Sequence, residues 1–179
     1  MSFIARLSLV LPFLVLACAT AVAQDWRHPA VDRYGDVVAV PEATYRPSPE
    51  RAHRIAFDLA GREDKDSVNV SLWYLARLVN LYALAGVPTD SLEVVGVLHG
   101  GATELALSRE AAATRAPELL DDLTLLEALT ARGVRFVVCA QSAASAGVDL
   151  DLERHPAVAV GLSAMTTLLE LRARGYVSP

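Results

Sequence analysis

The sequence predicts an α/β fold: a single domain with a mostly parallel sheet of about five strands and helices on both faces, in three layers. Short apolar segments alternate with longer helical patterns from residue 51 onward, as in βαβ units with right-handed crossovers. Residues 92–98 read Leu-Glu-Val-Val-Gly-Val-Leu, a near-continuous apolar run typical of a strand buried on both faces. The length suits one domain with a real core and is too short for two.

Residues 1–23 have the pattern of a signal peptide. Arg6 precedes an apolar run over residues 7–17 that is too short to span a bilayer, and Ala21-Val22-Ala23 forms a signal peptidase site. We therefore expect cleavage before Gln24 and a periplasmic location. In an alternative reading, residues 15–18 resemble a lipobox and Cys18 is lipidated. Plain cleavage is preferred because the Ala-x-Ala site is well placed.

The charge of the chain argues against nucleic acid as a partner. Without residues 1–23, 156 residues remain, with 15 basic and 21 acidic side chains and a net charge of −6, because the leader carries one arginine and no acid. Such a surface does not attract phosphate backbones, and the sequence has no basic stripe interleaved with aromatic residues. No second long apolar segment follows, so we expect no membrane span after removal of the leader.

Cysteine content defines the central question about function. Plain cleavage leaves Cys139 as the single cysteine. A lone thiol in an oxidising compartment cannot form an internal disulfide. The thiol is either buried and chemically inert, or exposed and used in the function of the protein.

Residues 24–50 are expected to form an irregular arm, because prolines at positions 29, 41, 47 and 49 interrupt them. Trp26 and Tyr34 would anchor the arm to the domain surface, and residues 37–40 would add a short edge strand. The α/β domain then covers residues 51–179.

The domain begins with a predicted strand at residues 53–60, followed by a charged turn and a long helix. Asp66 or Ser67 would cap this helix, which runs to about Ala85 and ends at Gly86. Its polar residues form one narrow stripe, and the rest is apolar enough for burial on more than one side. We expect a subunit interface on the second side. The stripe consists of Ser71, Tyr74, Arg77 and Asn80.

The remaining elements follow from periodicity and from capping residues. Strands are predicted at residues 92–98, 134–138 with Cys139 at the end, 157–161 and 176–177. Helices are predicted at residues 108–115, 117–131, 141–146 and 163–174. Ser163 does not lie in a nucleophile elbow and is expected to be the N-cap of the last helix.

Ligands of open parallel sheets bind outside the carboxyl ends of the strands, where His99 and Cys139 are predicted to lie. Cys139 precedes a short predicted helix whose positive end favours the thiolate, the nucleophilic form. His99 would orient or deprotonate the thiol if the two strands are neighbours. The competing interpretations are a cysteine that packs as a hydrophobic residue and a histidine that closes a strand end.

Gly100 and Gly101 would leave backbone N–H groups open to an anion, and with Gln141 and Ser142 they are the candidate substrate-binding residues. The glycine pair lacks the spacing of a phosphate loop or dinucleotide fingerprint, and we expect no cofactor. Metal binding is not expected either, because the four histidines show no ligand spacing. They are His28, His53, His99 and His155.

Four segments occur in order along the chain: residues 97–103 (VLHGGAT), 133–142 (GVRFVVCAQS), 162–166 (LSAMT) and 174–176 (RGY). They resemble the exported branch of the DsrE/DsrF-like family, and the resemblance is most specific in the first two. It extends back to Pro29, Tyr34-Gly35 and residues 78–82 (LVNLY), and so covers nearly all of the chain after the leader.

The resemblance implies a compact parallel α/β fold and multimeric assembly. It also implies a sulfur-relay role in which a persulfide is carried on the cysteine that corresponds to Cys139. Two positions depart from the family pattern. Ala140 stands where glycine is expected, and Arg115-Ala116-Pro117 replaces an Asn-Pro-Asn-like turn.

The leading hypothesis is a periplasmic sulfur carrier or sulfurtransferase-like homo-oligomer, with His99 as accessory base. A single cysteine supplies no resolving thiol, so a carrier requires a thiol-bearing protein acceptor. The alternative is a non-catalytic module that binds a small thiol or anion, or packs a multimer.

Overall fold

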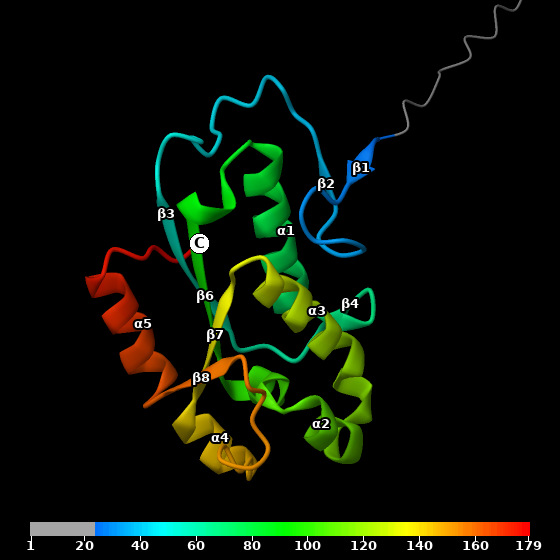
Figure 1. Ribbon diagram of the computed structural model, residues 1–179, viewed down its shortest axis with the longest axis vertical. Coiled ribbons are helices and arrows are strands. Elements are labelled where there is room, and N and C mark those ends of the chain that lie inside the picture. Colours follow the sequence, from blue (N-terminus) through cyan, green and yellow to red (C-terminus); the bar gives the residue numbers. More distant parts are fainter. Residues whose placement is uncertain (1–23) are drawn as a thin grey trace, which may run out of the picture.

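The computed structural model describes residues 24–179, so the predicted leader and Cys18 lie outside the described residues. The central sheet has four parallel strands in the order β3 (His53–Leu59), β6 (Leu92–Leu98), β7 (Arg135–Cys139) and β8 (Val158–Gly161) (Figure 1). The strand expected at residues 176–177 is reduced to one parallel bridge between Ile55 and Val177. The α/β prediction is confirmed, with four strands in place of about five.

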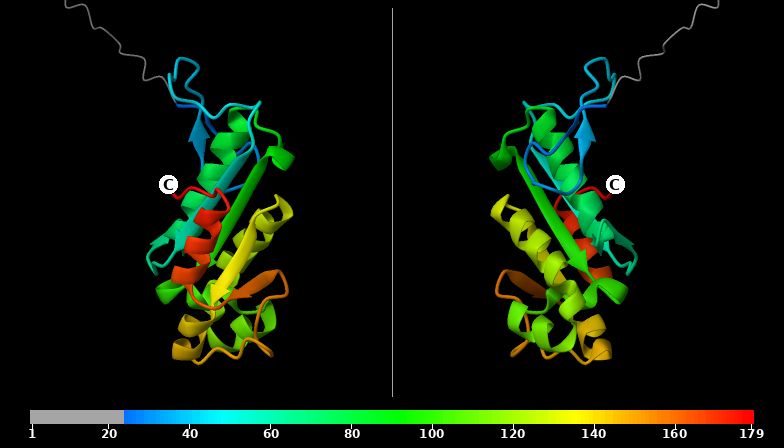
Figure 2. Two further views of the ribbon diagram at one scale, coloured as in Figure 1. Left: turned by 90° about the vertical axis from the view of Figure 1, so that its left-hand side faces the viewer. Right: turned by 90° about the vertical axis from the view of Figure 1, so that its right-hand side faces the viewer.

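Helices cover the two faces of the sheet unequally. On one face lie α1 (Val70–Leu84) and α3 (Leu120–Ala131), and on the other lies α5 (Ala164–Ala173) alone (Figures 1 and 2). The short helices α2 (Arg109–Arg115) and α4 (Ala140–Ala146) lie towards the carboxyl ends of the strands. Three 3₁₀ segments complete the chain: η1 (Thr89–Ser91), η2 (Gly100–Ala106) and η3 (Pro117–Leu119). None of the helices in residues 24–179 has the length and apolarity to cross a membrane.

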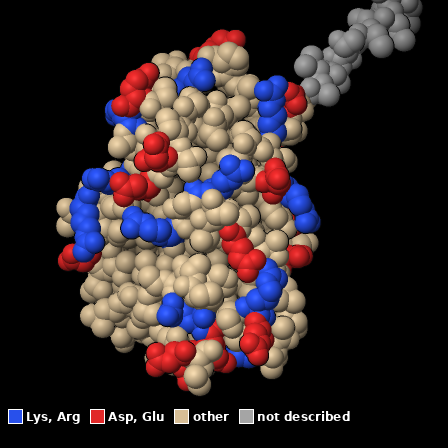
Figure 3. Space-filling model, in the orientation of Figure 1, with Lys and Arg blue, Asp and Glu red and all other residues tan. Residues whose placement is uncertain are grey.

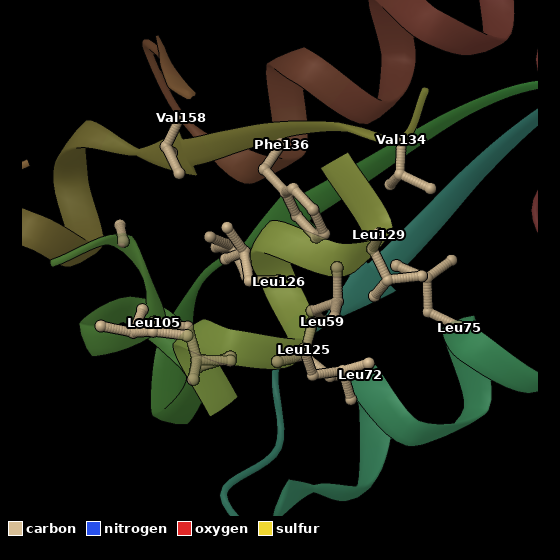
Figure 4. Packing of buried hydrophobic residues seen from close by; sticks show 14 of the residues in the cluster. Leu59, Leu72, Leu75, Leu105, Leu125, Leu126, Leu129, Val134, Phe136 and Val158 are labelled. Carbon is tan, nitrogen blue, oxygen red and sulfur yellow. The ribbon is translucent and has the colours of Figure 1, made fainter. Parts of the chain in front are cut away.

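The main core fills the space between the sheet and helices α1 and α3. Leucines of both helices and of β3 surround Phe136 of β7 (Figure 4). A smaller cluster lies under α5 and includes Val95, Val97, Cys139 and Ala164. Cys139 therefore belongs to the thinly covered face of the sheet, where only one helix lies above it.

The N-terminal arm packs on the second side of α1, the side where we expected a subunit interface. An interface at this helix stays a prediction. Asn80 is fully buried. Its Oδ1 accepts hydrogen bonds from the N–H groups of Ala30 and Val31, at 2.9 and 2.8 Å. Its Nδ2 donates to the carbonyl oxygens of Tyr34 and Gly35, at 3.0 and 2.9 Å. Asn80, one polar residue of the stripe, thus forms hydrogen bonds with backbone groups of the arm of the same chain.

Within the arm, β1 (Trp26–Arg27) and β2 (Val37–Val38) pair antiparallel with each other and do not extend the central sheet. Tyr34 is buried as expected, whereas Trp26 is half exposed. Gly35 has a positive φ of 65°, and a Cβ there would lie 2.1 Å from the backbone nitrogen of Arg77. Glycine is therefore required for the arm to approach α1 so closely.

Helix α1 begins later than predicted, because its cap is Asn69 and not Asp66 or Ser67. Those two residues form the turn of a small hairpin between β4 (Asp64–Lys65) and β5 (Val68–Asn69), with φ of 52° and 66°. The Asn69 side chain accepts a hydrogen bond from the Ser71 N–H at 3.0 Å. The backbone N–H of Asn69 in turn donates to Oδ1 of Asp122 in α3, at 2.5 Å.

The remaining helices lie close to their predicted ranges. Ser108 caps α2, and the predicted helix at residues 117–131 is η3 followed by α3. The Ser163 hydroxyl accepts a hydrogen bond from the Thr166 N–H at 3.1 Å. Ser163 is therefore the N-cap of α5, as predicted.

We predict that Asn80→Ala releases the arm. The substitution leaves several backbone groups of the arm without partners, and each buried unpaired group costs about 1–3 kcal/mol. Limited proteolysis should then cleave within residues 24–50 at least tenfold faster than in the wild type. The exposed Tyr74→Ala in the same helix is the control, and equal cleavage rates in the two variants would contradict the role of Asn80.

We also predict that Asp122→Asn stabilises the protein at high pH. Burial raises the pKa of Asp122 from 3.8 to about 6. The hydrogen bond from the Asn69 N–H opposes this rise, and the negative charges of Asp64 and Asp121 add to it. Because the folded state holds this proton more tightly, the free energy of unfolding falls as pH rises from about 4 to 6 and stays lower above. Asparagine keeps the acceptor oxygen and cannot ionise.

Urea unfolding should find Asp122→Asn more stable than the wild type by roughly 1–3 kcal/mol at pH 8 and nearly equal to it at pH 4. Asp121→Asn, at an exposed neighbouring position, removes only the smallest of the contributions that raise the pKa of Asp122 and should show a much smaller pH-dependent gain. An unchanged difference between pH 4 and pH 8 would contradict the prediction.

Candidate functional site

The candidate site is built around Cys139, the last residue of β7 and the N-cap of α4. Its Sγ accepts a hydrogen bond from the Ser142 N–H at 3.4 Å, the place that a serine or aspartate oxygen takes in most caps. Ala164, the first residue of α5, also packs against the thiol. Two helices therefore begin beside one sulfur atom, and the residue Cys139 retains 5% exposure.

The polar surroundings of the thiol favour its ionised form. Burial raises the pKa of Cys139, but hydrogen bonds outweigh burial, and the pKa lies below its ordinary value. The donors are the Ser142 hydroxyl and the backbone N–H groups of Ser142, Ala164 and Gln141. A thiolate is the nucleophilic form of cysteine, so this arrangement makes Cys139 chemically competent at lower pH than a free cysteine.

Strand register places His99 beside Cys139. Leu98 of β6 pairs with Val138 of β7 in the parallel ladder between the two strands. His99 and Cys139 are the residues that follow this pair. Same-register residues of neighbouring strands lie about 5 Å apart and point to one face of the sheet. Asp58 of β3 pairs with Val97 and so points to this face too.

The imidazole of His99 makes its hydrogen bond to Asp58 and not to the thiol. Nε2 of His99 lies 2.5 Å from Oδ1 of Asp58, and the two side chains are 27% and 51% exposed. Within residues 24–179, no hydrogen bond joins His99 to Cys139. The pair fixes Nε2–H as the donor to the carboxylate and leaves Nδ1 of a neutral ring as the acceptor.

Three of the four candidate binding residues gather at a hollow beside α4, which Cys139 itself does not line. Gly100, Gln141 and Ser142 line this hollow of about 390 Å³. The Gly100 N–H approaches the Ser142 hydroxyl at 3.4 Å. Gly101 faces elsewhere, towards Arg62, and its N–H donates to the carbonyl of Ala60 at 2.9 Å. The Gly101 N–H is thus not open to an anion, contrary to the expectation.

Sequence reasoning missed two residues that hold the site in place. Asp58 escaped notice because it lies one residue before the end of β3, although it has the same strand phase as His99. Arg115 donates to the carbonyl oxygens of Gly147 and Ala146, at 3.0 and 3.4 Å, and so holds the carboxyl end of α4. Arg115 belongs to the segment Arg115-Ala116-Pro117, which departs from the family pattern.

The other departure from the family pattern, Ala140 in place of glycine, causes no backbone strain. Ala140 is the first residue of α4 and is not among the non-glycine residues with positive φ in the described chain.

No three His, Cys, Asp or Glu side chains group as a metal-ligand set in residues 24–179.

Comparisons with known proteins agree on the fold. The model of the DsrE/DsrF-like family matches residues 45–177. Among solved structures, the chain is similar to MTH1491, a protein of unknown function from Methanobacterium thermoautotrophicum, with 20% identity and a TM-score of 0.50 over 71% of this chain and 97% of that one. A comparison with curated proteins gives no match.

We predict that Ser142→Ala makes Cys139 less reactive at neutral pH. Loss of the hydroxyl donor raises the pKa of the thiol, because less of the burial cost is then compensated. The midpoint of the pH profile of alkylation should move upward, and the rate at pH 7 should fall about two- to fivefold.

Ser145→Ala removes another hydroxyl from α4 that donates to the Gln141 carbonyl and not to the sulfur. Its alkylation profile should match the wild type. If the two variants behave alike, the hydroxyl of Ser142 has no specific effect on the thiol.

Proposed function

Because the chain belongs to the DsrE/DsrF-like family, which is associated with sulfur relay, we propose that it carries sulfur as a persulfide on Cys139. One observation carries the proposal: the lone described thiol lies at the carboxyl edge of the sheet, within a set of hydrogen-bond donors that lowers its pKa. Donors that favour a thiolate also favour the thiolate as a leaving group.

The proposed reaction needs no cofactor. The Cys139 thiolate attacks the outer sulfur of a donor R–S–SH, and the S–S bond of the donor breaks. R–S⁻ leaves, and Cys139 now carries the transferred sulfur as the persulfide Sγ–SH. An acceptor thiol then loses its proton to Nδ1 of His99 and attacks the outer sulfur. Cys139 departs as the thiolate, the acceptor becomes a persulfide, and His99 releases the proton to water. Asp58 would hold the ring in the tautomer that this step requires.

The proposal includes an exported homo-oligomer that transfers sulfur to a thiol-bearing protein. Export is supported by the leader pattern of residues 1–23. Assembly is supported by the face that α5 covers alone, where a groove of about 700 Å³ lies between α5 and the strands β7 and β8. Val160 of β8, half exposed, lies at this groove.

A second candidate function is a binding or assembly module without sulfur transfer. The observation that favours it is the 5% exposure of Cys139, because a thiol that no reagent reaches is only a small hydrophobic side chain. Titration of the thiol in the folded protein separates the two candidates.

We predict that treatment with an alkyl hydropersulfide adds one sulfur atom to Cys139. Peptide mapping by mass spectrometry should locate the added sulfur, dithiothreitol should remove it, and Cys139→Ser should not acquire it. His99→Asn should load normally and discharge to a thiol about tenfold more slowly, as expected for loss of a general base. A thiol that reacts only after unfolding would refute the carrier role and leave the module.

A further inference from the structure

We infer that Cys139 exchanges sulfur with partners whose substituents are uncharged and apolar, and discriminates against anionic donors such as thiosulfate. This inference rests on the carrier function proposed above and defines its substrate class. It follows from three features of the carboxyl edge of the sheet: its charge, its hydrogen-bond donors and its exposed apolar side chains.

The first feature is the lack of charged side chains around the sulfur. Three segments form this edge: residues 99–103, 139–148 and 161–169. They contain no lysine, arginine, aspartate or glutamate, and His99 is their only basic residue. The charged side chains that contact them include Asp58, through His99, and Arg115, which donates to the carbonyl oxygens of Ala146 and Gly147 at the far end of α4. In Figure 3 the lower left of the molecule, where β8 leads into α5, shows an area free of charged side chains.

The second feature is that the backbone donors nearest the sulfur are already engaged. The N–H groups of Gln141, Ser142 and Ala164 point to the Cys139 sulfur. The N–H of Gly101 is bound to the Ala60 carbonyl, and that of Gly100 approaches the Ser142 hydroxyl. Anion sites in proteins rely on free N–H groups or on cations. A sulfonate group placed here would lose hydration and gain neither.

The third feature is an apolar rim on the α5 side of the sulfur. Leu162 and Met165 flank the segment that brings the Ala164 N–H to the thiol, and each is 73% exposed. The Leu162 carbonyl accepts a hydrogen bond from the Gln141 side chain at 3.2 Å, which holds this rim against α4. An apolar substituent on the incoming sulfur therefore has an exposed apolar surface to contact on this side.

The charge on the reagent can be tested with a matched pair of alkylating agents, neutral iodoacetamide and anionic iodoacetate. The ratio of their rates at Cys139 should be about tenfold higher in the folded protein than in the same protein unfolded in urea. Ser145→Arg places a cation in the hollow and should lower this ratio about threefold. Thr89→Arg makes the same charge change at the opposite end of the sheet and should leave the ratio unchanged.

Sulfur donors test the same selectivity in the proposed reaction. Benzyl hydropersulfide should load Cys139 at least tenfold faster than thiosulfate, and faster than 2-hydroxyethyl hydropersulfide. The double variant Leu162→Ser, Met165→Ser should lose the preference for the benzyl compound while still loading. Equal rates for thiosulfate and benzyl hydropersulfide would overturn the inference and leave the carrier function standing. Failure of every donor and both alkylating agents would overturn the carrier function and the inference with it.

Discussion

The hydrogen bonds to the Cys139 sulfur connect the local structure of this protein to its chemistry. Capping atoms of helices are usually oxygens, which are strong acceptors. Here a sulfur caps α4 and also receives the first N–H of α5. Sulfur is a weak acceptor unless it is ionised, and charge-assisted hydrogen bonds are stronger. The beginnings of two helices are thus best satisfied when the thiol is a thiolate, so the same contacts that order this edge also activate the cysteine.

The unequal covering of the sheet explains why this contact is possible. On one face, α1 and α3 bury the large leucines and Phe136. On the other face, small side chains such as Ala56 and Ala164 let α5 lie close to the carboxyl edge. That helix leaves the neighbouring strands β7 and β8 partly open, next to the groove beside Val160. The core that stabilises the domain is therefore separate from the layer that holds the sulfur.

The sequence predicted well those features that depend on local pattern and less well those that depend on distant contacts. The strand at residues 92–98, the position of Cys139 and the cap at Ser163 follow from periodicity and side-chain type. Asn80 was assigned to the polar stripe of its helix, because nothing in that helix reveals that the arm returns to it. Asp66 and Ser67 are good capping residues, but the hairpin places them at positive φ. The pairing of Asp58 with His99 required the strand order.

The near-complete cover of the sulfur is compatible with the carrier function, because the resting thiol and the loaded persulfide differ in length. An S–S bond extends the side chain by about 2 Å. In the proposed persulfide, Sγ would stay held by Ser142 and Ala164, and the added sulfur would extend beyond it. A shielded resting thiol also resists the oxidation that exposed thiolates undergo. A carrier of the proposed kind would thus keep the inner sulfur shielded on the protein and offer the outer sulfur, which must leave.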